Sequence, residues 1–337
     1  MAFDVFAEAA PELLDWLEAN GSLLTCADDQ RLIQEGINID SIYILKSGNF
    51  SVYVSKDSNE SNDILLATLQ PGAIVGEMSM IENKLPVASV IAQAGSELLQ
   101  VKRQQLFVDL SKSADLECAF YRMLAFKISE QVKSQNQLAL SSQFKVHALI
   151  EPLRKVLTLF SDLNDRDIEW MRSNGISQQV LPGSLVIEQD KPVPDLLLIM
   201  AGSCEITMNT PDGEVVVGYA RRGEIIGEMS LLTKDRQLAT ANVKADSQGL
   251  QVLRLNKLQL MDQVQTNALF GAHMYKGLAR MLSSRSRDQL KIFGLSIRSQ
   301  DDIFSDDDDL LDFDELSGAS KAGRLFDWLC KEMMGLS

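Results

Sequence analysis

The chain has 337 residues, of which 45% are hydrophobic and 23% are charged, as in ordinary globular proteins. That length is enough for two domains, each with a core of its own. The formal net charge of −15 disfavours nucleic acid and anionic membranes as partners, because both bind basic surfaces.

The cysteines are scattered and never spaced as Cys-x-x-Cys; they are Cys26, Cys118, Cys204 and Cys330. This spacing favours reduced thiols over a disulfide framework or a metal site. The first residues contain no basic signal-peptide region, and no apolar run approaches the length of a membrane span. We therefore expect a cytoplasmic protein with no metal site and no membrane insertion.

Local patterns predict helix, then strands, then helix along the first part of the chain. Pro11 opens a short helix over residues 12–20. Period-two alternation in Phe50–Val54 and Ile64–Leu69 predicts half-buried strands. After Val101 the apolar period becomes helical, on a stripe of Leu106, Leu110, Phe120, Leu124, Ile128 and Val132. Residues 138–160 continue this period and predict a helical connector.

The remainder repeats the same series, so the chain contains one domain twice. Gly48 and Gly202 lie 154 positions apart, as do Leu32 and Val186. A polar loop is three residues longer in the first copy, and such insertions are tolerated in hairpin loops. The second helical stripe contains Leu258, Met261, Val264, Phe270, Met274, Leu278 and Leu282.

These patterns predict a fold of two β-rolls, jelly-roll-type barrels that are each flanked by helices. The expected boundaries are residues 1–136 for the first domain and 137–165 for the helical connector. The second domain then covers 166–290. Residues 291–337 are expected to form an acidic tail with a short amphipathic helix.

Two short motifs in register carry a family resemblance. Gly76-Glu77-Met78-Ser79 and Gly227-Glu228-Met229-Ser230 lie 151 positions apart, each after a strand that ends at glycine. With the closing motifs Ala88-Ser89 and Ala239-Thr240, they resemble the phosphate-binding cassette of the cyclic-nucleotide-binding family. That family includes the catabolite activator protein and the regulatory subunits of cyclic-AMP-dependent protein kinase.

The resemblance implies a nucleotide site in each copy, in degenerate form. Glu77 and Glu228 would accept a hydrogen bond from ribose, although capping of the short helix is the alternative. The implied residues are Gly76, Glu77, Met78, Ser79, Ala88 and Ser89 in the first copy, and Gly227, Glu228, Met229, Ser230, Arg236, Gln237, Ala239 and Thr240 in the second.

The family's phosphate-binding arginine is missing from the expected position in both copies. Two residues before the closing alanine stand Pro86 in the first copy and Gln237 in the second, with Arg236 beside it. Removing one partner of a buried charge pair costs about 2–5 kcal/mol. We therefore expect cyclic AMP binding to be lost in domain 1. In domain 2 it depends on whether Arg236 reaches the phosphate or is only an exposed loop cation.

The acidic tail allows two interpretations. Mixed acidic and apolar residues are typical of a solvated disordered segment. The alternative is a linear motif for a protein partner, in which Leu310, Leu311, Phe313 and Leu316 dock in a groove. The final stretch, 321–334, has one apolar helical face and is expected to pack on the body or on a partner.

Taken together, the sequence predicts a non-enzymatic regulatory or adaptor protein that acts through protein–protein contacts. No cofactor is required, although domain 2 retains a cyclic nucleotide as a candidate ligand. The alternative is a nucleotide sensor for cyclic AMP, cyclic GMP or cyclic di-GMP that uses mainly domain 2. The helices after each roll either form a homodimer seam or pack within the chain. An activator-type transcription factor is disfavoured, since the last residues are few and acidic.

Overall fold

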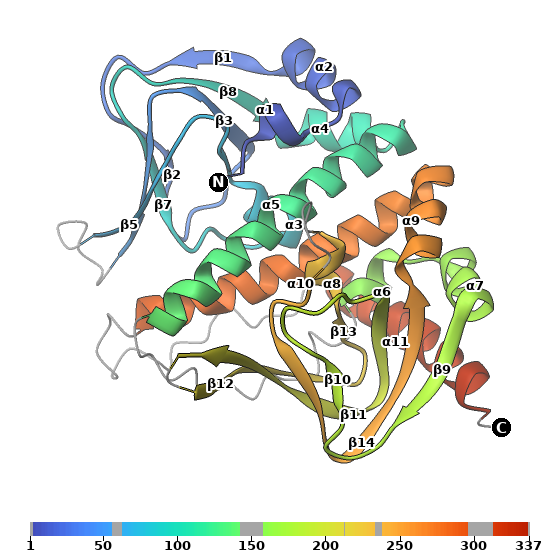
Figure 1. The fold of residues 1–337 in the computed structure, drawn as a ribbon. Coiled ribbons are helices and arrows are strands. Elements are labelled where there is room, and N and C mark those ends of the chain that lie inside the picture. The colour runs from blue at the N-terminus through green and yellow to red at the C-terminus, as the bar shows by residue number, and fades with distance from the viewer. Residues whose placement is uncertain are drawn as a thin grey trace. The chain divides into compact units, whose positions relative to one another are not determined.

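The computed structural model describes residues 3–55, 63–141, 158–211, 213–232, 238–295 and 313–335 (Figure 1). Side chains of 136–141, 288–295 and 313–319 are not described. The chain divides into two compact units. Unit 1 contains Met1–Glu130 and Leu282–Leu310, and unit 2 contains Gln131–Met281 and Leu311–Ser337. The second half of a long C-terminal helix therefore belongs to unit 1.

The N-terminal part of the chain folds into short strands between helices. Its elements are α1 (Val5–Glu8), α2 (Pro11–Asn20), β1 (Ser22–Thr25), β2 (Gln30–Ile33), β3 (Ser41–Ser47), β4 (Phe50–Val54), β5 (Ile64–Leu69), β6 (Ile74–Val75), α3 (Glu77–Glu82), β7 (Ser89–Ala92), β8 (Glu97–Lys102), α4 (Arg103–Leu110) and α5 (Ala114–Ser141). The helix expected after Pro11 and the strands at 50–54 and 64–69 are confirmed.

The strands of unit 1 form two antiparallel sheets, in the orders β1-β8-β3-β6 and β2-β7-β4-β5. Fully buried Leu45, Phe50 and Leu98 pack in a shared core. The expected roll is confirmed, but the closed barrel is wrong for the strands described here. The chain turns sharply between β3 and β4 at Gly48, where φ is 87° and Ser96 leaves no space for a Cβ atom. The described strands leave each sheet with two unpaired edge strands, β1 and β6 in one sheet and β2 and β5 in the other.

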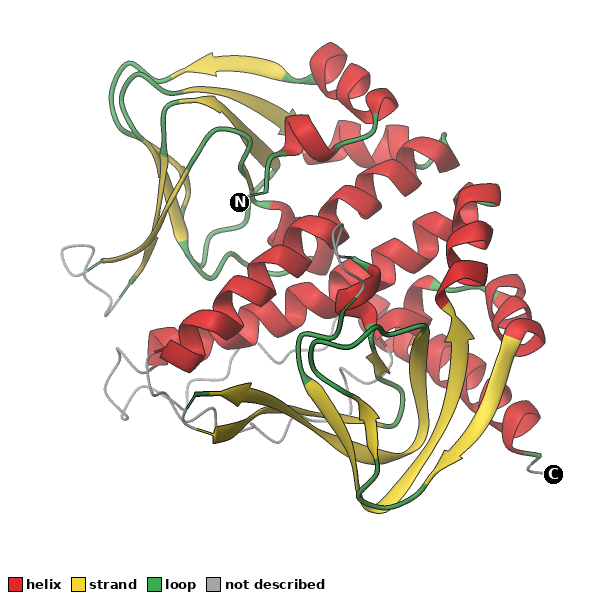
Figure 2. Cartoon of the chain, viewed as in Figure 1, coloured by secondary structure: helices red, strands yellow, loops and turns green. Residues whose placement is uncertain are grey.

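The second copy uses longer strands (Figure 2). Its elements are α6 (Thr158–Asp162), α7 (Asp165–Asn174), β9 (Gly175–Val180), β10 (Leu185–Ile187), β11 (Asp195–Thr210), β12 (Gly213–Arg221), β13 (Ile225–Ile226), α8 (Glu228–Leu231), β14 (Asn242–Asn256), α9 (Lys257–Thr266), α10 (Ala268–Leu295) and α11 (Phe313–Met334).

One bent sheet in unit 2 takes the place of the two sheets in unit 1. Its order is β10-β14-β11-β12, with β13 paired to β11 and β9 to β14. The register shifts twice between β11 and β14 around Gly202, so each long strand bends there and serves as two. The duplication is visible in the pairing. Ile42 opposes Val101 in unit 1, and Leu196 opposes Leu255, 154 positions later, in unit 2.

The helices bury most of the predicted apolar stripes. All six residues of the first stripe are buried, and so are Phe270, Met274, Leu278 and Leu282 of the second. The prediction that Leu258 belongs to the buried stripe is wrong, because 74% of this residue is exposed. The side chain of Asn256 caps α9 and accepts hydrogen bonds from the next turn, and this start of the helix turns Lys257 inward instead.

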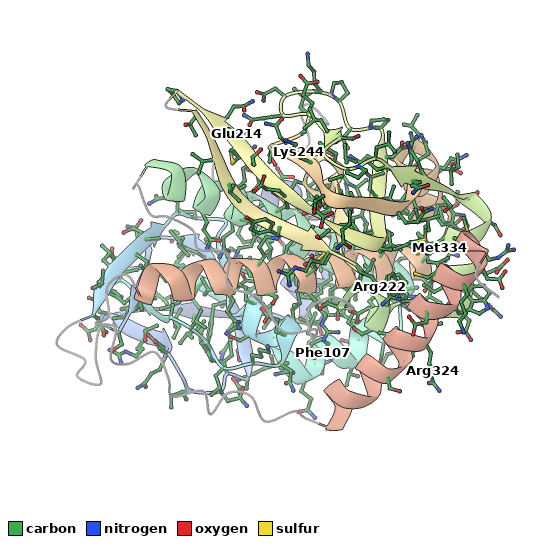
Figure 3. The ribbon with its side chains drawn as sticks, turned by 90° about the horizontal axis from the view of Figure 1, so that it is seen from below. Phe107, Glu214, Arg222, Lys244, Arg324 and Met334 are labelled. Carbon is green, nitrogen blue, oxygen red and sulfur yellow. The ribbon has the colours of Figure 1, made fainter. Side chains whose placement is uncertain are left out.

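Helix α11 packs on unit 2. It contacts α6 and α7, and Phe326 lies edge-to-face on Phe160 with ring centroids 5.0 Å apart. The Arg222 guanidinium lies over the Phe326 ring and pairs with Asp327 at 2.8 Å. Figure 3 shows Arg222 beside this helix. The stretch 321–334 thus packs on the body of the protein.

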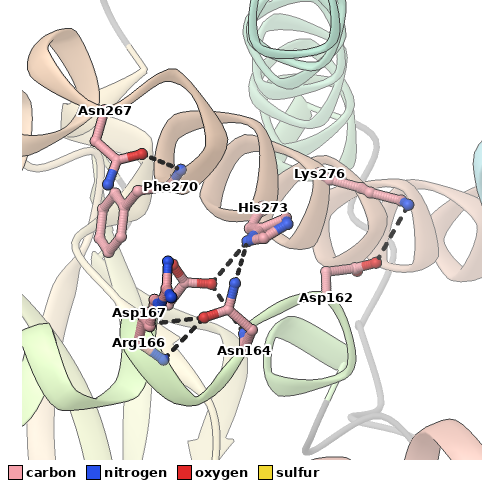
Figure 4. A network of polar contacts seen from close by, with 8 residues as sticks. All are labelled: Asp162, Asn164, Arg166, Asp167, Asn267, Phe270, His273 and Lys276. Carbon is pink, nitrogen blue, oxygen red and sulfur yellow. Dashed lines mark hydrogen bonds and ion pairs between the residues drawn. The ribbon is translucent and has the colours of Figure 1, made fainter. Parts of the chain in front are cut away.

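A polar network fixes the start of α7 in unit 2 (Figure 4). Asn164 and Asp167 form a capping box, in which each side chain accepts from the other residue's backbone N–H. The buried Asp167 carboxylate also lies 2.7 Å from Nδ1 of His273 on α10. Helices α7 and α10 are therefore joined by a partly buried contact.

Some expectations fall outside the described residues. The middle of the expected connector, at 142–157, is not described, although helix continues to Ser141 and resumes at Thr158. Leu310 and Leu311 also lie outside, and the side chains of Phe313 and Leu316 in α11 are not described. None of the helices described here combines the length and apolarity required to cross a bilayer.

Candidate functional site

Each copy of the Gly-Glu-Met-Ser motif begins a short helix directly after a buried strand. Gly76 follows β6 and Gly227 follows β13, and both have φ of 89°. A Cβ atom on Gly76 would lie 3.1 Å from the carbonyl oxygen of Ser41. On Gly227 it would lie 3.1 Å from the carbonyl oxygen of Asp195, the equivalent residue. Glycine is thus required twice for the same reason: a left-handed backbone against a neighbouring strand. We call residues 76–89 cassette 1 and residues 227–242 cassette 2.

In cassette 1 the motif glutamate is buried and meets a cation of the same unit. Glu77 is only 2% exposed, and its Oε1 accepts a hydrogen bond from Nζ of Lys127 on α5. A carboxylate can be buried when a cation compensates its charge. The Glu77 carboxylate is therefore paired with a side chain of the same unit in this structure, whereas the resemblance implies a contact with ribose.

In cassette 2 the cation comes from another element. Lys257, the first residue of α9, is 4% exposed and donates a hydrogen bond to Oγ of Ser230. Burial lowers the pKa of Lys257 to about 8, against the opposing effects of Glu228 and Asp195. Glu228 itself is 3% exposed. An ammonium group is thus buried beside this motif as well.

The other motif residues serve the short helices. The carbonyl oxygen of Ser79 accepts the N–H of Asn83 and that of Lys84, which ends α3. The hydroxyl of Ser230 donates to the carbonyl oxygen of Gly227 at 2.9 Å. Met229 is buried, and Met78 is half-buried. These contacts are those of local structure.

Hydrogen bonds show which closing residues are equivalent. The N–H of Glu35 donates to Oγ of Ser89 at 3.0 Å, and the N–H of Gln189 donates to Oδ1 of Asn242 at 2.8 Å. Glu35 and Gln189 lie 154 positions apart. Ser89 therefore corresponds to Asn242, not to Thr240 as the motif comparison suggested. Ala88 then corresponds to the residue before Asn242, and not to Ala239.

The same reasoning places the position of the missing arginine. The N–H of Gly36 donates to the carbonyl oxygen of Pro86 at 2.9 Å. The N–H of Asp190, again 154 positions later, donates to the carbonyl oxygen of Ala239 at 2.9 Å. Gly36 and Asp190 both have positive φ, so the two turns match. Ala239 is thus the counterpart of Pro86.

This equivalence moves Gln237 two residues away from the closing position. Arg236 and Gln237 lie outside the described residues. Pro86 and Ala239 are both buried, and neither side chain carries a charge or a hydrogen-bond donor. At the equivalent position, both copies therefore lack a guanidinium group.

Sequence reasoning missed the groups that pack around the cassettes. Lys127 and Lys257 come from different elements and have no common motif. Glu82, the last residue of α3, accepts hydrogen bonds from Ser283 and Arg287, about 200 positions later. Only the burial of Glu82 at the end of a short helix could have drawn attention to it. In the described residues, no group of acidic, histidine and cysteine side chains is arranged to hold a metal ion.

Comparison with known proteins identifies the fold and the motifs. The model of the family described as cyclic nucleotide-binding domain matches residues 24–111 and 177–267, together more than half of the chain. A cAMP-dependent protein kinase regulatory subunit of Colletotrichum orbiculare is 23% identical over 233 residues, which cover 66% of this chain and 52% of that protein. The type II regulatory subunit of Drosophila melanogaster is 23% identical over 202 residues, 60% of this chain and 44% of that protein. The chain spans about half the length of these curated relatives.

Two solved structures are also similar to this chain. The regulatory domain of Toxoplasma gondii PKA with cAMP is 17% identical, covers 78% of this chain and 89% of its own, and has a TM-score of 0.29. The regulatory subunit of a cAMP-independent protein kinase A from Trypanosoma cruzi, bound to guanosine, is 16% identical, covers 79% and 81%, and has a TM-score of 0.29.

The two matched segments coincide with the two rolls and contain both cassettes. After the second segment, the described residues contain the helices α10 and α11 and no further sheet. The chain therefore belongs to the cyclic nucleotide-binding domain family, with two copies of the domain in tandem.

Proposed function

We propose that this chain is a non-enzymatic regulatory protein that acts through protein contacts, and that domain 1 does not bind cyclic AMP in the family's manner. The observation that carries the proposal is the equivalence of Pro86 and Ala239. A bidentate guanidinium–phosphate pair cannot form with a pyrrolidine ring or a methyl group. Loss of one partner of a buried charge pair weakens binding by about 2–5 kcal/mol, which is about thirtyfold to several thousandfold.

Domain 2 lacks the same group at the same position, so we extend the expectation of weak binding to it. The motif residues of domain 2, 227–230, lie at the start of α8, and the carbonyl oxygen of Ala239 accepts the N–H of Asp190. We therefore treat a cyclic nucleotide in domain 2 as the alternative function, a sensor, that calorimetry decides.

Calorimetry of the full chain with cyclic AMP, cyclic GMP and cyclic di-GMP tests the proposal. We expect no binding at low micromolar concentration. The variants Pro86→Arg and Ala239→Arg restore a guanidinium at each closing position, and a gain of cyclic AMP binding in either supports the reasoning. Low-micromolar binding by the wild type that disappears in Glu228→Ala would contradict the proposal and support the sensor.

A protein partner is the second half of the proposal. The relatives are, by name, regulatory subunits of a protein kinase, so a kinase catalytic subunit is the first partner to mix with this chain. Gel filtration and kinase assays then report complex formation and inhibition. Deleting residues 300–337 is an unsuitable test of the tail, because it removes Phe326 from the core of unit 2. The variant with Leu310→Ser and Leu311→Ser leaves α11 intact. If every partner is retained by that variant, the tail motif is excluded as the docking segment.

The proposed partner surface does not include the long helices. Their apolar stripes are buried within the single chain, which favours intramolecular packing over a homodimer seam. The motif residues of both cassettes remain our proposed, degenerate nucleotide-site residues. We place the protein in the cytoplasm, as its composition suggests.

A further inference from the structure

Hydrogen bonds within unit 1 join the second half of α10 to cassette 1. The hydroxyl of Ser283 donates to Oε1 of Glu82, and Nε of Arg287 donates to Oε2 of Glu82 at 3.2 Å. Nη1 of Arg287 donates to the carbonyl oxygen of Leu85 at 2.7 Å. Ser283 and Arg287 are four residues apart, so they lie on one face of the helix. That face meets the end of α3 and the loop that follows it.

These contacts are buried. Ser283 is fully buried, Arg287 is 6% exposed and Glu82 is 7% exposed. Charged hydrogen bonds are stronger where water is excluded. The contrast is Arg103 of α4, which reaches the same loop at Asn83 over 2.8 Å but is solvent-exposed there. The loop after α3, residues 83–88, which we call the closing loop, therefore has a buried contact with Arg287 and an exposed contact with Arg103.

The loop is held on its other side as well. The carbonyl oxygen of Leu85 accepts a hydrogen bond from Arg287, and the carbonyl oxygen of the next residue, Pro86, accepts one from the N–H of Gly36. The neighbouring Asn83 ends α3 in the left-handed conformation, with φ of 54°, which asparagine adopts more readily than most residues other than glycine. Hydrogen bonds from outside the loop therefore hold it at Leu85 and at Pro86.

Two nitrogens of the Arg287 guanidinium group, Nε and Nη1, make the contact with the cassette. Among the described residues, the third nitrogen, Nη2, has no hydrogen-bond partner.

We propose that the second half of α10 is an intramolecular clasp, which holds cassette 1 in the conformation described here without a nucleotide and whose release frees the loop after α3. Arg287 is the positioning residue of the clasp, and Glu82 is its anchor on the cassette. The clasp goes beyond the proposed loss of nucleotide binding, because it explains how contacts within the chain, and not a ligand, hold the loop after α3 in one conformation.

Hydrogen exchange measured by mass spectrometry on the full chain tests the clasp. Arg287→Met keeps most of the side-chain volume and removes every donor, so we expect amides of residues 76–90 to exchange at least about tenfold faster. Arg103→Met is the matched control and should change the same amides by less than about twofold, because its contact is exposed. The strands β11 and β14 of unit 2 report whether each variant is folded.

A second pair of variants protects the test against misfolding of Arg287→Met. Arg287→Lys keeps the charge but cannot bridge Glu82 and Leu85, and Ser283→Ala removes one hydrogen bond, so both should raise exchange at 76–90 by an intermediate amount. Exchange at 76–90 that stays at the wild-type rate in all three clasp variants, or rises equally in Arg103→Met, overturns the clasp. Nucleotide calorimetry of the wild type is unaffected by that result, so the two proposals fail separately.

Discussion

Truncation of Phe326 tests whether α11 is an integral part of unit 2. The side chain is fully buried, its ring centroid lies 5.0 Å from that of Phe160, and the Arg222 guanidinium lies 4.6 Å from the same centroid. Phe→Ala changes at such sites cost about 3–5 kcal/mol, through lost transfer energy and the cavity left behind. The aromatic pair accounts for about 1 kcal/mol of this. We expect Phe326→Ala to lower the free energy of unfolding of unit 2 by about 4 kcal/mol.

Urea unfolding followed by the fluorescence of Trp170, which packs edge-to-face on Phe270 within unit 2, measures this loss. Trp328→Ala is the matched control: it lies two residues further along the same helix and is 40% exposed. We expect that variant to change the free energy of unfolding by less than about 1 kcal/mol. Equal effects of the two variants, or a loss below about 1 kcal/mol in Phe326→Ala, would refute the packing of α11.

Two further predictions concern charge and backbone. The folded-state pKa of Lys257, about 8, is below its ordinary value of 10.5, so the unfolded chain holds the proton more tightly. The free energy of unfolding of the wild type should therefore rise between about pH 8 and 10.5. Lys257→Met should be more stable than the wild type at pH 7 by up to about 3 kcal/mol and should not show that rise. Urea midpoints that change with pH in the same way in both proteins would disprove this prediction. Gly202→Ala should cost about 3 kcal/mol, because φ is 87° and the new Cβ would lie 2.2 Å from the carbonyl oxygen of Gly249. Gly218→Ala, with open space around it, is the control, and similar thermal midpoints for both alanine variants would contradict the reasoning.

The duplication could be predicted from the sequence because hairpin glycines and alternating strands are present in both copies. The spacing of 154 between Gly48 and Gly202 reappears in the strand registers. It contains less information about whether the strands close a barrel. Closure depends on pairing between sheet edges, and residues 50–54 show only which face is buried.

The closing motif of cassette 2 shows where pattern comparison is ambiguous. The segment Ala239-Thr240-Ala241-Asn242 contains two small pairs, and either can be matched with Ala88-Ser89. Backbone hydrogen bonds from the turn at Asp190 choose the later pair. A similar ambiguity affects Leu258, since helical periodicity does not show at which residue α9 begins.

The two lysines beside the cassettes, half-buried Lys127 and buried Lys257, extend the argument about the motifs. In unit 1, Lys127 binds Glu77 from a long helix that follows the roll, whereas in unit 2 Lys257 comes from the first residue of α9 and acts on Glu228 through space. A buried carboxylate that waits for a neutral ribose hydroxyl would leave its charge uncompensated in the empty protein. Here an internal ammonium lies close to each motif glutamate, by different routes. In unit 1 the Lys127 ammonium compensates the charge of Glu77, whereas in unit 2 the burial of Lys257 outweighs its attraction to Glu228.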